Sequence, residues 1–240
     1  MRKKASFAAL LYRELILCRK SLMVYAVSTV IFTTIPILVI LSLRYGNLTM
    51  LPEHIVADIR AHNDLMLTLY AAICPSMLVM VLAETAVFDT KTNWDHFRRS
   101  TPVKPAQLAL AKYALYAIVL LVSAAFSMAV MALCHRLLGS PMTVTDTAVI
   151  MALITGITVM CVLSQLFIML FRSVDKGMLA MIGCGMAGVF LLPAEMRNSF
   201  SVEGLLEAAE KLLPLSPLIL MGILSLGFGL TTFIYTRREK

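Results

Sequence analysis

Six long stretches of the chain contain no Asp, Glu, Lys or Arg, and the charged residues gather between them. A helix needs about 20 apolar residues to cross the hydrocarbon core of a bilayer, and its backbone groups must find their partners within the segment. The pattern therefore predicts an all-α integral membrane protein, with six transmembrane helices in a single domain of residues 1–240. The stretches are Ser21–Leu43, Leu65–Ala83, Tyr113–His135, Thr147–Phe171, Gly177–Ala194 and Leu212–Thr236.

The composition fits lipid as the solvent. Of the 240 residues, 60% are hydrophobic and 15% are charged, and the mean hydropathy is +0.86. A soluble globular domain carries roughly a quarter charged residues, so this chain is too apolar for that class.

The lysines and arginines predict the orientation. Sixteen of the 21 lie in residues 1–20, 84–112, 172–176 and 237–240, and five lie in the other flanks. Because cytoplasmic flanks collect Lys and Arg, we expect both termini in the cytoplasm. The net charge of +7 then follows from topology, and we expect no nucleic-acid partner.

Two segments outside the spans show helical periodicity of apolar residues. Residues 5–20 predict an interfacial helix on the cytoplasmic leaflet, with a plain continuation of the first span as the alternative. In segment 195–213, an apolar stripe predicts an amphipathic extracellular helix before the last span at 214–236. We expect Leu205 and Leu206 in that stripe to form an outer lid over a transport pathway, with a simple surface anchor as the alternative.

No catalytic or metal-binding pattern is evident in the sequence. We find neither a phosphate-binding G-x-x-x-x-G-K-[ST] loop nor an H-E-x-x-H helix, and the five cysteines lack metal-ligand spacing. No ionisable residue lies in the middle of a predicted span, where coupled carriers usually keep one. We therefore expect no enzyme, cofactor or metal in this chain, and active transport would need a partner. Gln165 beside Ser164 either lines a pathway or forms a hydrogen bond between helices.

The largest predicted cytoplasmic loop lies between the second and third spans. It contains the only tryptophan of the chain, Trp94, and Phe97 lies three residues later, so a short helix would place both on one face. Asp95, Arg98 and Arg99 surround them. Aromatic anchors ringed by charges are typical of protein interfaces, whereas a tryptophan anchored at the lipid headgroups is the alternative.

This loop resembles that of the ABC-2 family of ABC-transporter membrane subunits. The resemblance rests on Asp89, Lys91, Trp94, the Pro102-Val103 pair and the Lys112-Tyr113 pair, together with the six-span layout. Within the family, the chain is most similar to the permeases of phenol-soluble-modulin and antimicrobial-peptide exporters in the bacterial plasma membrane.

The resemblance implies a transmembrane permease of an ATP-driven exporter for amphipathic peptides or other amphiphiles. It implies a homodimer or a pairing with a close paralogue, surrounded by membrane lipids, and a cytoplasmic ABC ATPase that binds ATP and Mg²⁺. A coupling region at 89–101 would contact the ATPase, and Glu84 would form a salt bridge near the gate. The ATPase-binding residues would be Asp89, Lys91, Trp94, Asp95, Phe97, Arg98 and Arg99.

Two functions of other classes stay open at this point. One is a membrane sensor or assembly protein that transports nothing, which would lack an associated ATPase. The other is an intramembrane enzyme, which the missing catalytic pair argues against.

Overall fold

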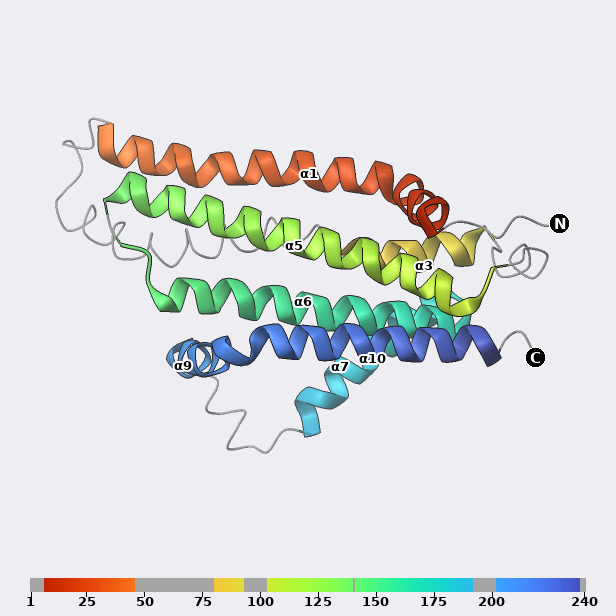
Figure 1. Cartoon of the computed structure of the whole chain (residues 1–240). Coiled ribbons are helices and arrows are strands. Elements are labelled where there is room, and N and C mark those ends of the chain that lie inside the picture. The colour runs from red at the N-terminus through yellow and green to blue at the C-terminus, as the bar shows by residue number, and fades with distance from the viewer. Residues whose placement is uncertain (1–6, 46–79, 93–102, 140, 192–201, 238–240) are drawn as a thin grey trace.

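The computed structural model describes residues 7–45, 80–92, 103–139, 141–191 and 202–237, and these ranges are helical apart from short turns. Four long helices lie alongside one another (Figure 1): α1 (Phe7–Tyr45), α5 (Pro105–Leu138), α6 (Val144–Phe171) and α10 (Ser216–Arg237). The shorter elements are α3 (Val81–Lys91), α7 (Val174–Leu191), α9 (Val202–Leu212) and the 3₁₀ turn η3 (Leu213–Leu215).

Four helices in the described ranges are long and apolar enough to cross a membrane: Phe7–Ser42, Pro105–Leu137, Val144–Phe171 and Glu207–Arg237. They coincide with the first, third, fourth and sixth predicted spans, so the prediction of an all-helical, multi-pass fold is confirmed. Most of the second predicted span lies outside the described residues. The fifth falls on the 18-residue helix α7, and the total of six spans stays a prediction.

Helix α1 joins two elements that the sequence analysis separated. It contains 39 residues without interruption, so the predicted interfacial helix and the first span are one helix. At 1.5 Å per residue it is about 58 Å long, against a hydrocarbon core of about 30 Å. Its first turns are angled away from the rest of the helix (Figure 1). The interfacial location of these turns stays a prediction.

The two ends of the bundle differ in what they bring together. The start of α1, the whole of α3, the start of α5 and the end of α10 lie at one end, and α9 lies at the opposite end beside the start of α6 (Figure 1). The first of these ends carries the flanks that the sequence analysis assigned to the cytoplasm.

At the opposite end of the bundle, a turn with capping residues connects α5 to α6. Gly139 has a φ of 76°, the left-handed conformation that commonly ends a helix because glycine has no Cβ to clash. Thr143 and Asp146 then form a capping box, each side chain accepting from the other's backbone N–H. His135 Nε2 lies 3.1 Å from Asp146 Oδ2 and fastens the end of α5 to the start of α6.

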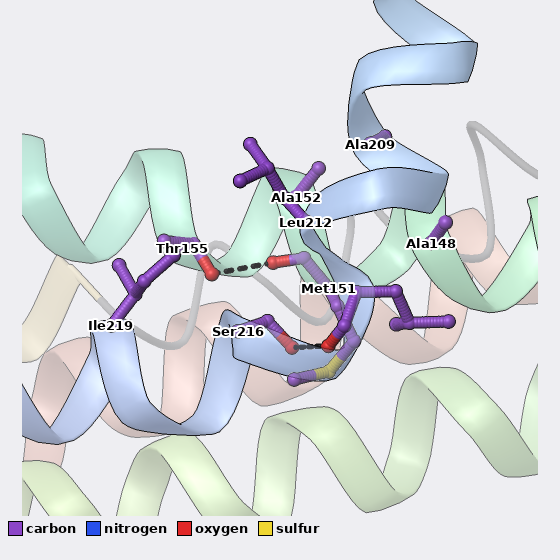
Figure 2. A pocket seen from close by; sticks show the side chains of 9 residues that line it. Ala148, Met151, Ala152, Thr155, Ala209, Leu212, Ser216 and Ile219 are labelled. Carbon is purple, nitrogen blue, oxygen red and sulfur yellow. Dashed lines mark hydrogen bonds between the residues drawn. The ribbon is translucent and has the colours of Figure 1, made fainter.

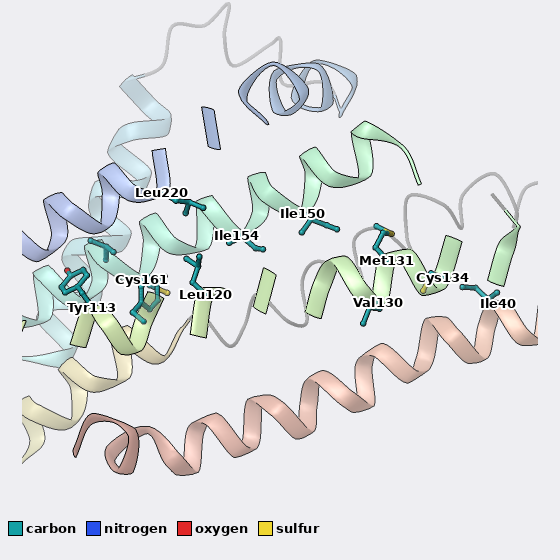
Figure 3. Close-up of a cluster of buried hydrophobic side chains, with 12 residues drawn as sticks. Ile40, Tyr113, Leu120, Val130, Met131, Cys134, Ile150, Ile154, Cys161 and Leu220 are labelled. Atoms are coloured by element: carbon teal, nitrogen blue, oxygen red, sulfur yellow. The ribbon is translucent and has the colours of Figure 1, made fainter. Parts of the chain in front are cut away.

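The largest apolar core lies between α5, α6 and α10 and includes Ile40 from α1 (Figure 3). Tyr113 packs edge-on against Phe228 of α10, and its hydroxyl lies 3.2 Å from Thr231 Oγ1. The core therefore holds three of the four long helices together through contacts spread along their length.

Close helix contacts depend on two glycines. A Cβ on Gly227 of α10 would lie 2.5 Å from the Tyr113 hydroxyl and 2.8 Å from Val162 Cγ1, and one on Gly177 would lie 2.7 Å from the Ile168 backbone. Gly183 of α7 has no such neighbour within 4 Å, so no close contact among the described residues requires a glycine there. The side chains of α7 after Cys184 lie outside those described.

We expect Gly227→Ala to destabilise the fold, because Tyr113 is held by its bond to Thr231 and cannot move aside freely. Overpacking of this kind costs about 1–3 kcal/mol. Gly229→Ala, two residues along the same helix, is the matched control, since its added Cβ would meet nothing within 4 Å. The free energy of unfolding in mixed micelles, measured by titration with sodium dodecyl sulfate, checks this. Equal stability of the two variants would contradict it.

Candidate functional site

Helix α3 carries three of the residues predicted to act at the cytoplasmic side, Glu84, Asp89 and Lys91. It packs against α1, α5 and α6 and ends where the Thr92 N–H and hydroxyl both donate to the Phe88 carbonyl, at 2.9 and 2.8 Å. Lys91 is exposed at this end. The helix therefore stops directly before residues 93–102, which contain most of the predicted ATPase-binding positions.

A cluster of four charged side chains joins α1, α3 and α5; we call it the ion cluster, and it consists of Arg13, Glu14, Asp89 and Lys112. The Arg13 guanidinium pairs with Glu14 and donates to Asp89 Oδ1 at 2.7 Å. Lys112 Nζ donates to Glu14 Oε2 at 3.1 Å and lies 2.6 Å from Asp89 Oδ2. The second contact is an ion pair without hydrogen-bond geometry. Glu14 and Lys112, which are 98 positions apart in the chain, thus meet in one place.

The ion cluster is almost closed to solvent. The side chain of Glu14 is 0% exposed and that of Lys112 is 1% exposed. The same three helices, with α6 and α10, also form a second apolar core, which consists of Leu10, Ala86, Leu108, Ala111, Ile168, Met169 and Tyr235. Because buried charges are strongly destabilising without a partner, the two acids and two bases must stay together.

The pKa of Asp89 reflects a balance between burial and the two neighbouring positive charges. Burial alone would raise the pKa of this carboxyl, but the Lys112 ammonium and the Arg13 guanidinium outweigh burial and hold the pKa below its usual value of 3.8. The charged form of Asp89 is therefore the stable one at neutral pH.

Glu84 lies one and a half turns before Asp89 and has a different partner. Its Oε1 accepts a hydrogen bond from the Tyr25 hydroxyl of α1 at 2.7 Å, and its Oε2 is buried without a hydrogen bond. The resemblance implied a salt bridge near the gate. Among the described residues, Glu84 joins α3 to α1 through a neutral hydroxyl, and its salt bridge near the gate stays a prediction.

Gln165 and Ser164, the residues predicted to line a pathway or to join helices, are buried in α6. The Gln165 amide donates to Met169 Sδ one turn along the same helix, at 3.8 Å, and its Oε1 has no hydrogen-bond partner. Within the described ranges no hydrogen bond joins Gln165 to another helix, and its Oε1 acceptor is buried without a partner there. Whether Gln165 lines a pathway or joins helices stays a prediction.

Several predicted residues fall outside the described part of the structure. Trp94, Asp95, Phe97, Arg98 and Arg99 lie in residues 93–102, and the side chains of Leu205 and Leu206 are likewise outside those described. Their roles stay predictions.

Arg13 and Glu14 were not predicted as members of a site, and both lie in the segment 5–20 that was predicted as an interfacial helix. One signal was present, since Glu14 is the only acid among the basic residues 1–20, and an acid in a basic flank indicates an internal partner.

Comparison with known proteins gives the family of the chain. The family profile described as ABC-2 family transporter protein matches residues 9–236, which is nearly the whole sequence. The chain belongs to this family. No curated protein and no solved structure matches it. Membership makes the chain a membrane permease component of an ABC transporter rather than a catalytic enzyme, and it implies an ATPase partner.

We expect Lys112→Met to lower the free energy of unfolding by about 3–5 kcal/mol, because breaking a buried ion pair leaves an uncompensated charge. Adding Glu14→Gln should recover part of the loss by restoring the balance of charges. Lys104→Met is the matched control, since Lys104 is exposed immediately before the same helix. Thermal unfolding in detergent measures all three. A Lys112→Met protein as stable as the control would show that the ion cluster contributes nothing.

The lowered pKa of Asp89 also predicts a dependence on acid. A carboxyl whose folded-state pKa lies below its unfolded value stabilises the fold above the unfolded value and loses that effect as pH falls through the folded pKa. The stability advantage of the wild type over Asp89→Asn should be constant near neutral pH and shrink as pH falls through 3.8 and below. Thermal unfolding of both proteins across this range tests it. An advantage that grew on acidification would refute the assignment.

Proposed function

We propose that this ABC-2 family permease is the transmembrane half of an ATP-driven exporter and pairs with a second copy of itself or with a close paralogue. One observation carries the proposal beyond family membership. The ion cluster fixes α3 to α1 and α5 directly ahead of the predicted coupling region, residues 89–101. A contact made by an ATPase on that region would therefore act on two spans at once.

The proposed coupling uses the residues in sequence order. Trp94 and Phe97 enter a groove on the ATPase, and Arg98 and Arg99 meet acidic residues beside it. The ATPase binds ATP and Mg²⁺ and supplies the energy. A displacement of the coupling region is passed to α3, whose Asp89 forms ion pairs with Arg13 and Lys112, and so to the cytoplasmic ends of α1 and α5.

The substrates that fit this proposal are amphipathic peptides or other amphiphiles. The interior of the described bundle is mainly apolar, and Gln165 offers a buried acceptor without a partner. An apolar interior of this kind suits molecules with long apolar faces and few polar groups. The proposal agrees with the sequence resemblance to peptide-exporter permeases. In this view α9 caps the outer end of the pathway, and both termini face the cytoplasm of a bacterial cell.

We expect Trp94→Ala to weaken binding of the cognate ATPase at least tenfold. Aromatic hot spots contribute about 2 kcal/mol or more, and about 1.4 kcal/mol is a factor of ten. Phe126→Ala is the matched control, because Phe126 is an exposed aromatic residue in the middle of α5. The affinity of each variant and of the wild type for the ATPase is measured with the permease in lipid nanodiscs. ATP-dependent efflux of a fluorescent amphipathic peptide is measured in vesicles that contain the permease and the ATPase.

The outcomes distinguish a Trp94 that contacts the ATPase from a Trp94 that lies at the lipid headgroups. Loss of ATPase binding and of efflux in Trp94→Ala alone supports the proposal. Normal ATPase affinity with normal efflux would place Trp94 at the lipid headgroups. Wild-type vesicles without ATP-dependent efflux of any amphiphile would overturn the proposed exporter function.

A further inference from the structure

A cavity of about 150 Å³ lies where α9, η3 and the start of α10 meet α6, at the end of the bundle opposite the ion cluster (Figure 2). Small side chains create the space, notably Ala148 and Ala152 on α6 and Ala209 on α9 (Figure 2). The remaining lining residues are Met151, Thr155, Leu212, Leu213, Ser216 and Ile219.

The walls of the cavity are apolar in their chemistry. The lining contains two hydroxyls, and both donate to backbone carbonyls of their own segments: Thr155 to Met151 and Ser216 to Leu213, each at 2.7 Å (Figure 2). Neither proton is free for a ligand. Apolar cavities of about 150 Å³ stay dry and take up hydrocarbons such as benzene. The cavity therefore selects a hydrocarbon group and disfavours water or a charged headgroup.

The helix that forms the outer wall is held in place. Thr145 in the first turn of α6 donates a hydrogen bond to Glu210 of α9, and α9 continues through η3 into α10. Because α9 is fastened at both points, its Ala209 and Leu212 stay opposite the alanines of α6. The space is thus a consequence of how the two segments are joined and of the small residues at the contact.

The position of the opening indicates what can enter. Ala152, Leu212 and Ile219 line the cavity and are also exposed, so the space is open at this side. Both α6 and α10 are helices that can span a membrane. Thr155 lies 11 residues along α6, about 16 Å from its start at 1.5 Å per residue, which is the depth of lipid tails rather than headgroups.

We propose that this cavity binds the acyl chain of a phospholipid from the leaflet at that end of the protein. The chain inserts between α6 and α9 and fills space that no side chain of the lining occupies. It contacts α6, α9 and α10 together, so the bound lipid holds α9 against the two spans. The proposal concerns a lipid site and does not depend on the transported substrate.

The test uses the full-length protein in phosphatidylcholine nanodiscs that contain a small fraction of a photoreactive phosphatidylcholine. One lipid carries the diazirine at the end of an acyl chain, and a second carries it on the headgroup. After illumination, mass spectrometry of peptides locates the adducts. We expect the chain-end probe to label residues 148–155 and 209–219 more strongly than the exposed lipid-facing residues of α5 such as Leu121. We expect the headgroup probe to leave residues 148–155 unlabelled.

Filling the cavity provides the second arm. The double variant Ala152→Leu with Ala209→Leu should lower chain-end labelling at the cavity at least about tenfold, a factor that corresponds to about 1.4 kcal/mol. Ala125→Leu, on the exposed face of α5, is the matched control and should label as the wild type does. Ala209→Leu alone repeats the test if the double variant does not fold. Uniform labelling of all exposed helices, or strong cavity labelling in the folded filled variant, would overturn the proposal.

Discussion

The rest of this structure depends on two acids and two bases that meet at one end of the bundle, two of them fully buried and two partly buried. Glu14 and Lys112 are almost wholly removed from solvent, and a charge in such a place is tolerated only with its partners present. The partners come from α1, α3 and α5, so the requirement for charge balance fixes how these three helices meet. Apolar packing alone would not, since it is non-directional and permits helices to slide.

The spans could be predicted from the sequence because the cost of a charge in lipid is large and local. A stretch without Asp, Glu, Lys or Arg is a property of neighbouring residues, and three of the four matching helices contain their predicted stretch whole. That the first helix begins well before residue 20 was not predictable in the same way. Arg19 and Lys20 indicated an end of the span, but a helix continues through charged residues once it has left the hydrocarbon core, as α1 does.

The ion cluster could not be assembled from the sequence, because its members are far apart along the chain. Lys112 and Glu14 are 98 positions apart. The resemblance singled out Lys112, but no local signal showed that it would be buried while Lys104 is exposed. Gln165 is a second residue whose partner could not be predicted from the sequence. Its burial followed from its place in an apolar span, whereas its partner depends on which side chain of which helix comes within reach. In the structure the hydrogen-bond acceptor for the Gln165 amide is Met169 of the same helix.

The contrast between the two ends of the bundle indicates where the permease can move. At the ion cluster, a shift of one helix would separate charges that are largely shielded from solvent, so we expect α1, α3 and α5 to move there as a unit. At the opposite end, α9 meets α6 across an apolar cavity, where contacts reform at little cost after a shift. We therefore expect a force applied next to α3 to pass to α1 and α5 through the charged end. We expect it to be taken up as a change of packing at the apolar end, where the capped turn at Gly139 and the hydrogen bond between α9 and α6 limit how far the helices separate.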